Sequence, residues 1–173
     1  MTVPLGSLME AAVRRLAGAG IPDARREARL LAALALDCSP DALSAGTARD
    51  LDAAQAACFA ALVHRRQKRE PLSRIRGSRE FWSLDFALDA ATLDPRPDSE
   101  TLVATALELV PDGTPVRVLD LGTGSGCLLI AFLSERPQAA GVGKDIDAAA
   151  VRQATRNAEP HGIGSRAPFP TGD

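Results

Sequence analysis

The feature that most constrains the fold is an apolar run that leads directly into a glycine-rich segment. The run holds Val116, Val118, Leu119 and Leu121, and the segment is Asp120-Leu121-Gly122-Thr123-Gly124-Ser125-Gly126. Such a run is typical of a parallel strand buried on both faces. Residues 128–135 then have helical spacing, 139–146 predict a second strand, weakened by Gly141 and Gly143, and 148–159 predict a second helix. The order strand, loop, helix, strand, helix indicates an α/β domain.

The glycine-rich segment is a candidate ligand-binding loop. Glycines let the chain turn tightly and bring its backbone against a ligand. Asp145 ends the second predicted strand, about 20 residues after Gly122, the distance at which a carboxylate reaches ribose hydroxyls in nucleoside-binding α/β folds. We therefore favour cofactor binding over a purely structural turn. For Asp145 the alternative is a helix N-cap, although Asp147 is better placed for that role.

The spacing of the glycines restricts which class of cofactor the loop can bind. The dinucleotide fingerprint G-x-G-x-x-G would need a third glycine at Cys127, so that pattern fails. Glycine stands at Gly126 instead, and the resulting G-x-G-x-G preceded by Asp120 resembles the first motif of class I methyltransferases. This resemblance implies S-adenosylmethionine as cofactor. The predicted cofactor-binding residues are Gly122, Thr123, Gly124, Ser125, Gly126 and Asp145, and no metal ligand is predicted.

The first 70 residues have the pattern of a small, alanine-rich helical bundle with a thin core. Ser7 and Glu10 form a capping-box pattern, and Pro22-Asp23 opens a second helix. Ser39-Pro40-Asp41 is a further helix start, and Asp50 or Asp52 caps a last helix. The predicted stripe on this last helix is Leu51, Gln55, Cys58, Leu62 and Arg66, widened by Phe59 and Val63.

Between the helical bundle and the α/β domain, the spacing of apolar residues changes from the helical period to alternation at every second residue. Trp82, Leu84, Phe86 and Leu88 alternate with polar or small residues, which predicts a strand with one buried face, and Gly77 suits a turn before it, so that a hairpin links two domains. The segment Asp94-Pro95-Arg96-Pro97 is expected to be extended, because each proline disfavours helix in the residue before it. A helix is predicted over 99–110.

Charge and cysteine content exclude several classes of function. The net charge of −2 gives no global argument for binding nucleic acid or an acidic membrane. Cys38, Cys58 and Cys127 lack metal-knuckle or redox spacing, so we expect reduced thiols in a cytoplasmic protein, two of them in helix packing. We expect neither a signal peptide nor a membrane span.

A basic stretch covers residues 64–79 and is offset only by Glu70. The favoured interpretation is a solvated helix end and linker, because runs of charge are usually solvated. The alternative is a contact surface for an acidic partner or RNA. The sequence leaves the role of this stretch open.

Three blocks together resemble the HemK/PrmC family of release-factor glutamine methyltransferases. They are Glu70-Pro71-Leu72 with Gly77-Ser78-Arg79-Glu80-Phe81-Trp82, then residues 94–103 around Pro95-Arg96-Pro97, then Val118 to Gly126. The resemblance implies a helical bundle over 1–70 that recognises release factors, a hairpin and linker over 71–97, and the start of a Rossmann-like methyltransferase domain over 98–173. Within that domain it places residues 96–100 beside the methionine end of the cofactor. Asp94 and Lys144 depart from the family pattern.

This resemblance also implies the reaction. The family transfers a methyl group from S-adenosylmethionine to the side-chain amide of the glutamine in the GGQ loop of peptide chain release factors. Its N-P-P-Y motif holds that amide, and no segment of this sequence matches the motif, so no catalytic residue is assigned. Asp173 aligns with the acidic residue of a G-D-W segment. We therefore expect residues 1–173 alone to be poorly stable and inactive; robust methyl transfer by them would refute this.

Two other interpretations stay open at this point. The glycine loop also permits another class I methyltransferase that acts on nucleic acid or a small molecule. A non-catalytic chain whose helical part only binds a partner is the third. The Phe81-Trp82 and Pro95-Arg96-Pro97 blocks favour the release-factor enzyme, with release factors as partners and no direct contact with nucleic acid or membrane.

Overall fold

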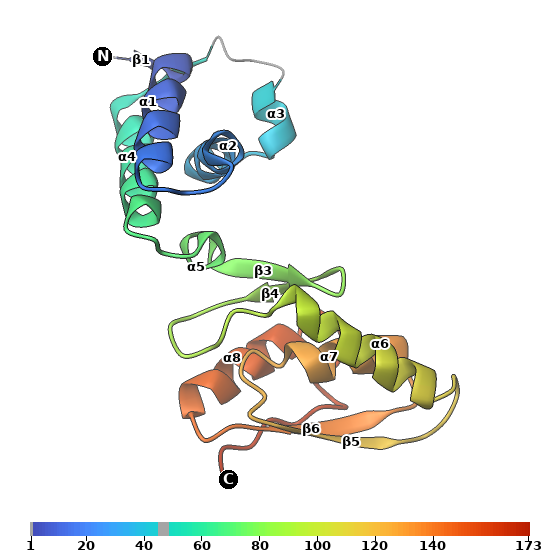
Figure 1. The fold of residues 1–173 in the computed structure, drawn as a ribbon. Coiled ribbons are helices and arrows are strands. Elements are labelled where there is room, and N and C mark those ends of the chain that lie inside the picture. The colour runs from blue at the N-terminus through green and yellow to red at the C-terminus, as the bar shows by residue number, and fades with distance from the viewer. Residues whose placement is uncertain (1, 45–48) are drawn as a thin grey trace. The chain divides into compact units, whose positions relative to one another are not determined.

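The computed structural model describes residues 2–44 and 49–173 (Figure 1). Two compact units make up the chain, residues 1–76 and residues 77–173. Their boundary falls inside the predicted hairpin-and-linker segment 71–97. Each unit has a hydrophobic cluster of its own, with buried members between Leu5 and Ile75 in the first and between Phe81 and Phe169 in the second.

The first unit is helical, as its sequence pattern predicts. Its elements are β1 (Val3–Pro4), α1 (Leu5–Gly18), α2 (Ala24–Ala35), α3 (Pro40–Ser44), β2 (Asp50–Leu51), α4 (Ala53–Gln67) and α5 (Leu72–Arg76). Alanine contributes many of the buried side chains, so the core is thin. The buried residues are Leu5, Ala12, Leu16, Ile21, Ala24, Ala28, Leu31, Ala32, Ala33, Leu36, Leu43, Leu51, Phe59, Val63 and Ile75.

Tertiary pairing decides where α1 begins. The predicted Ser7–Glu10 capping box is wrong: the helix starts at Leu5, three residues before the start that a cap at Ser7 implies, and its N-cap residue Pro4 makes no side-chain cap bond. Pro4 belongs to β1, which pairs antiparallel with β2, and the Leu5 amide donates to the Arg49 carbonyl at 2.9 Å. The neighbouring strand pair therefore supplies a partner for the first amide of the helix, in place of a side-chain cap.

Helix α4 confirms the predicted cap and corrects the predicted face. The Asp52 carboxylate accepts from the Gln55 amide at 2.8 Å, and the Gln55 side chain accepts from the Asp52 amide at 3.1 Å, a complete capping box. The stripe through Cys58 is wrong, because Cys58 is exposed while Phe59 and Val63 are buried. The use of Gln55 in the cap removes it from the packed face.

The second unit begins with the hairpin, formed by β3 (Ser78–Phe81) and β4 (Leu84–Ala87). A hairpin is confirmed, but the single strand expected from Trp82 onward is wrong. The turn lies at Trp82 and Ser83, with φ of 54° and 57°, so the apolar alternation continues across a turn. Leu88 donates back to the Gly77 carbonyl at 2.8 Å and closes the open end of the hairpin.

The rest of the second unit is an α/β arrangement. It contains the 3₁₀ turn η1 (Pro97–Ser99), α6 (Glu100–Leu109), β5 (Arg117–Leu121), α7 (Cys127–Glu135), β6 (Ala140–Lys144) and α8 (Ala148–Ala158). β5 and β6 pair in parallel, with Leu119 opposite Val142. In Figure 1 all three helices lie above this strand pair, and α6 and α7 lie side by side.

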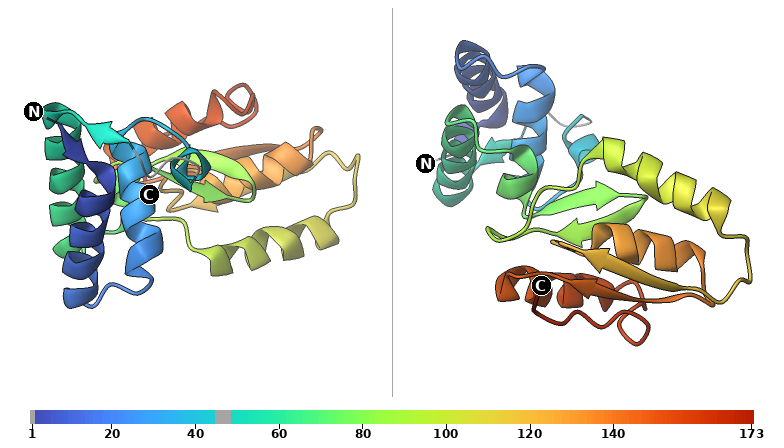
Figure 2. Two further views of the ribbon diagram at one scale, coloured as in Figure 1. Left: turned by 90° about the horizontal axis from the view of Figure 1, so that it is seen from above. Right: turned by 60° about the horizontal axis from the view of Figure 1, so that its bottom comes forward.

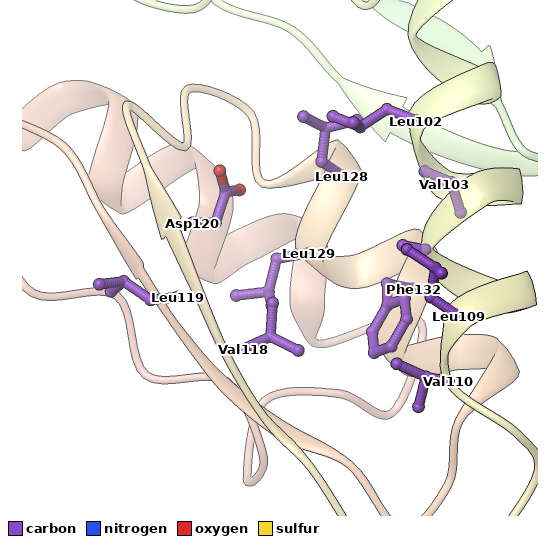
Figure 3. A pocket seen from close by; sticks show the side chains of 11 residues that line it. Leu102, Val103, Leu109, Val110, Val118, Leu119, Asp120, Leu128, Leu129 and Phe132 are labelled. Carbon is purple, nitrogen blue, oxygen red and sulfur yellow. The ribbon is translucent and has the colours of Figure 1, made fainter.

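β5 differs from the prediction of a strand buried on both faces. Leu119 is 60% exposed and Leu121 is 66% exposed. Figure 3 shows the Leu119 side chain pointing away from Leu129 and Phe132 of α7. The apolar run therefore predicts the strand correctly but not its burial.

The C-terminal segment, which has no clear period in the sequence, runs beside β6 (Figure 2). Gly141 donates to the Arg166 carbonyl at 2.8 Å and Gly143 to the Pro168 carbonyl at 3.2 Å, and Asp145 forms a parallel bridge with Thr171. A Cβ on Gly143 would lie 2.6 Å from the Phe169 ring. Glycine in β6 therefore marks close approach of neighbours rather than a weak strand.

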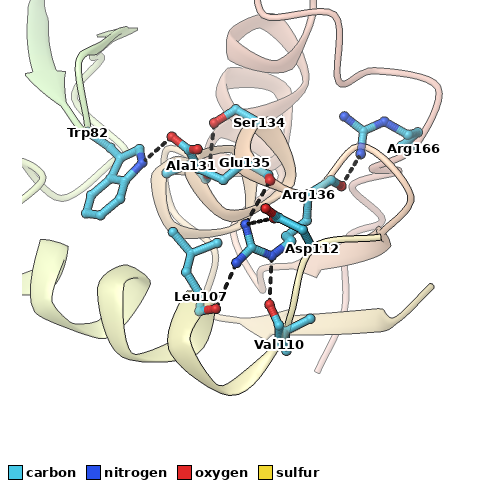
Figure 4. A network of polar contacts seen from close by, with 9 residues as sticks. All are labelled: Trp82, Leu107, Val110, Asp112, Ala131, Ser134, Glu135, Arg136 and Arg166. Carbon is cyan, nitrogen blue, oxygen red and sulfur yellow. Dashed lines mark hydrogen bonds and ion pairs between the residues drawn. The ribbon is translucent and has the colours of Figure 1, made fainter. Parts of the chain in front are cut away.

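Two arginines satisfy the last carbonyls of helices α6 and α7. Arg136 donates to the carbonyls of Leu107 and Val110, both at 2.8 Å, and pairs with the Asp112 carboxylate at 2.8 Å (Figure 4). Arg166 does the same for α7 through the Leu133 carbonyl at 3.0 Å. A cation at a helix C-terminus also complements the helix dipole, so these side chains fix both helices next to the strands.

Candidate cofactor-binding site

The glycine loop joins β5 to α7 and is held at both ends by backbone hydrogen bonds. The amides of Gly122 and Thr123 both donate to the Lys144 carbonyl at 2.9 Å, and the Gly126 amide donates to the Thr123 carbonyl at 2.8 Å. Gly122, Gly124 and Gly126 have φ of 73°, 55° and 80°. L-residues with side chains rarely adopt these values, so the three glycines are required by the bend itself.

The three glycines face different surroundings. A Cβ on Gly122 would meet nothing within 4 Å, and one on Gly124 only the Gly122 carbonyl oxygen at 4.0 Å. One on Gly126 would lie 3.0 Å from Ile130 and 3.1 Å from Ala154. The first two glycines thus leave open space above the loop for a ligand, while the third lets α7 and α8 pack closely. No side chain lies within 4 Å of the Cβ positions of Gly122 and Gly124.

Asp145 stands beside the open part of the loop. Its Oδ2 accepts from the Gly124 amide at 2.9 Å and its Oδ1 accepts from the Asp147 amide at 2.9 Å. The N-cap of α8 is Asp147, whose carboxylate accepts from the Ala149 amide at 2.7 Å, so the alternative of Asp145 as the cap is excluded. A carboxylate has about four lone-pair positions, so Asp145 can still accept from ribose hydroxyls.

Thr123 and Ser125 turn their side chains inward, and both are buried. The Thr123 hydroxyl donates to the Asp120 carboxylate at 2.7 Å. Burial raises the pKa of the Asp120 carboxyl, while the bond from Thr123 acts in the opposite direction. Of the predicted binding residues, Thr123 and Ser125 therefore have buried side chains that shape the loop from inside.

The segment predicted beside the methionine end of the cofactor has a structural partner in the hairpin. The Glu100 carboxylate accepts from the Trp82 amide at 2.8 Å, and the indole of Trp82 donates to the Glu135 carboxylate at 2.9 Å. Two acidic side chains, one at the start of α6 and one at the end of α7, thus hold the hairpin turn. No spacing pattern in the sequence predicts either contact.

Comparison with known proteins supplies the family. Residues 7–77 match the family model described as PrmC N-terminal domain, and residues 113–173 match the one described as Methyltransferase domain. The chain belongs to the PrmC family. The resemblance stated from the three sequence blocks is thereby confirmed.

Individual relatives agree with this assignment. The chain is 49% identical to the release factor glutamine methyltransferase of Rhodospirillum rubrum, over 98% of this chain and 52% of the relative. It is 43% identical to the protein of the same name from Bradyrhizobium diazoefficiens, over 90% of this chain and 53% of the relative. The PrmC-family chain thus spans about half the length of the curated relatives it matches.

Among solved structures, a SAM-dependent methyltransferase from Geobacter sulfurreducens in complex with S-adenosyl-L-homocysteine matches part of this PrmC-family chain. The sequence identity is 36% and the TM-score is 0.38. The match covers 45% of this chain and 30% of that protein.

An apolar groove lies between α6, α7 and β5 of the PrmC-family chain, with a volume of about 310 Å³ (Figure 3). Leu102 and Leu109 of α6 border it and are 61% and 77% exposed, and Asp120 is its one ionisable lining residue. The predicted helix over 99–110 is confirmed, but these two apolar residues are not buried. The groove offers too few polar groups to orient a nucleoside, in contrast to the loop near Asp145.

The basic stretch 64–79 is largely engaged within the PrmC-family chain. Arg65 pairs with Glu70 at 2.5 Å, Arg66 pairs with Glu27, and Arg69 donates to the Ala19 carbonyl at 2.7 Å. Bonds from Glu70 and Glu27 raise the pKa of Arg65 and Arg66, respectively. These contacts tie the end of α4 to neighbouring segments and favour a structural role for the stretch.

The three cysteines are free thiols, and Cys38 and Cys127 pack against the two cores. Within residues 2–44 and 49–173, no cluster of three or more histidine, cysteine or acidic side chains could hold a metal ion. No helix of that same part of the chain is long and apolar enough to cross a membrane.

Proposed function

We propose that this chain binds S-adenosylmethionine at the glycine loop and serves the methylation of the GGQ glutamine of peptide chain release factors. The relatives named release factor glutamine methyltransferase support the reaction and the partner. The observation that carries the cofactor assignment is the open space above Gly122 and Gly124, directly beside the Asp145 carboxylate.

The role of each site residue follows from its position. Gly122 and Gly124 let the cofactor approach the backbone, and Gly126 fixes the loop against the helices. Asp145 orients the ribose through hydroxyls that donate to its carboxylate, while the buried Thr123 and Ser125 keep the loop in shape. The bound cofactor supplies a methyl group on a sulfonium, and these residues fix the position of that methyl. This sequence contains no N-P-P-Y motif, so none of its residues is assigned to the amide nitrogen.

The proposed contact for the release factor is the helical unit, which covers residues 1–70. Residues 71–97 then form the connection, and residues 98–173 form the cofactor-binding domain. Because release factors act on ribosomes, the proposed compartment is the cytoplasm. Titration of the chain with a release factor tests this partner. Loss of binding when residues 1–76 are exchanged for an unrelated helical bundle would support the proposal, whereas undiminished binding would contradict it.

Replacement of Asp145 by alanine tests the cofactor site. Loss of a charged hydrogen-bond acceptor costs about 1.5–3 kcal/mol, so the affinity for S-adenosylmethionine should fall about tenfold to a hundredfold. Equilibrium dialysis with labelled cofactor measures this change. The matched control is Asp147→Ala, which removes the cap of α8 and should lower stability but leave the affinity unchanged. Equal affinities of wild type and Asp145→Ala would exclude a contact with the ribose.

A further inference from the structure

Asn157 of α8 contacts the glycine loop at Ser125. Its side chain is 3% exposed, and its Nδ2 donates to the Ser125 carbonyl at 2.9 Å. Ala154, one turn earlier on α8, is the residue against which Gly126 packs. α8 therefore contacts the second half of the loop at two successive turns.

The amide of Asn157 is saturated with hydrogen bonds. Its Oδ1 accepts from the Ala87 amide at 3.0 Å and from Gln153 Nε2 at 3.3 Å. Its Nδ2 donates to the Ala87 carbonyl at 3.1 Å as well as to Ser125. All donor and acceptor positions that a carboxamide offers are thus used. Through them the Asn157 side chain joins the loop to β4 of the hairpin, whose Ala87 lies 70 positions before Asn157 in the sequence.

Only a carboxamide fits this pattern of partners. An aspartate would direct an oxygen at the carbonyls of Ala87 and Ser125 with no hydrogen to share, and an apolar residue would leave buried backbone groups without a partner. The first half of the loop has other anchors, at Lys144 and Asp145. In the second half the Gly126 amide donates to the Thr123 carbonyl, and the Ser125 carbonyl between them accepts from Asn157 Nδ2.

We propose that Asn157 is a positioning residue, which holds the Ser125 carbonyl and hence the Gly124–Gly126 backbone in the form that accepts the cofactor. The inference rests on the proposed function, since it assigns Asn157 to the same site. Asn157 itself does not face the open space above Gly122 and Gly124; it acts through the loop.

The first test compares the affinity of wild type and of Asn157→Asp for S-adenosylhomocysteine. Equilibrium dialysis measures both affinities between about pH 5.5 and 8. The temperature is one at which circular dichroism shows that both proteins are folded. In Asn157→Asp, burial and the facing carbonyls of Ala87 and Ser125 favour the protonated form of the new carboxyl group. This protonated form can donate one of the two hydrogen bonds that Asn157 Nδ2 made. The ratio of dissociation constants should exceed tenfold near pH 8 and fall toward one at low pH. A ratio near one throughout, or a constant loss, would overturn the proposal.

His161→Ala is the matched control. His161 Nε2 contacts the Asp85 carbonyl at 3.0 Å, and its ring packs on Phe86, so it holds the same strand without contacting the loop. The affinity of His161→Ala should equal that of wild type. If His161→Ala loses as much affinity as Asn157→Asp, loss of the anchor of the hairpin alone explains the effect. The proposed role of Asn157 at the loop would then be wrong.

Amide hydrogen exchange gives a second test that needs no cofactor and serves if Asn157→Asp does not fold. In Asn157→Ser the Gly126 amide should exchange at least tenfold faster than in wild type, and the Gly122 amide should not, because Lys144 holds it. Equal acceleration at both amides would show a general loss of stability and overturn the proposal. If wild type binds no S-adenosylhomocysteine, the proposed function fails, and exchange alone decides the role of Asn157.

Discussion

For single residues, Asp120 in β5 and Asp145 after β6 show how two carboxylates next to the glycine loop acquire different tasks. Asp145 accepts from two backbone amides beside open space, whereas Asp120 lies against the core with Thr123 as its partner. Burial raises the pKa of Asp120, so the folded protein binds its proton more tightly than the unfolded chain does. The contribution of Asp120 to the free energy of unfolding is therefore full below its ordinary pKa of about 4 and is lost as pH rises through the raised value.

We accordingly expect Asp120→Asn, which cannot titrate, to gain stability relative to wild type as pH rises from about 4 to 7. Denaturant unfolding at several pH values measures the difference. Thr123→Val serves as the comparison, because loss of the bond that lowers the pKa should extend the fall of stability to higher pH. A difference between wild type and Asp120→Asn that does not vary with pH would contradict this account.

Among the elements, the hairpin turn between β3 and β4 carries backbone strain that a substitution at Ser83 can relieve. Ser83 is exposed and has φ of 57°, a region that costs an L-residue about 1–2 kcal/mol. Ser83→Gly should raise the free energy of unfolding by about 0.5–1 kcal/mol, after subtraction of the added freedom of the unfolded chain. Ser83→Val should lower it, because a branched side chain suits this region least. Guanidinium unfolding followed by Trp82 fluorescence measures both, and equal values for the two variants would refute the strain.

At the scale of the whole molecule, each unit has its own core, and the one tryptophan, Trp82, belongs to the second. Fluorescence therefore reports on residues 77–173, and helical circular dichroism reports on both units. Glu27→Gln breaks the half-buried Glu27–Arg66 pair of the first unit and should cost about 1.5–3 kcal/mol. We expect the dichroism transition to shift and the fluorescence midpoint to stay. An equal shift of both would mean that the two cores unfold as one.

Local signals in the sequence predicted much of the fold. The bend after β5, the caps at Asp52 and Asp147, and the helix start at Ser39 depend on residues within a few positions of each other. The predicted binding loop and Asp145 do lie together, because the carboxyl ends of neighbouring parallel strands meet at one edge of a sheet. Binding by these residues stays a prediction.

The α/β order, the glycine bend and the acidic residue beside it could be predicted from local sequence, because backbone preferences and apolar periods act over a few residues. The start of α1, the turn at Trp82, the strand-like path beside β6 and the position of Asn157 emerge only in the folded chain. Each of these depends on hydrogen bonds between segments far apart in the chain. Such bonds leave no periodic pattern in either partner, because a single buried amide or carboxylate is enough to make them.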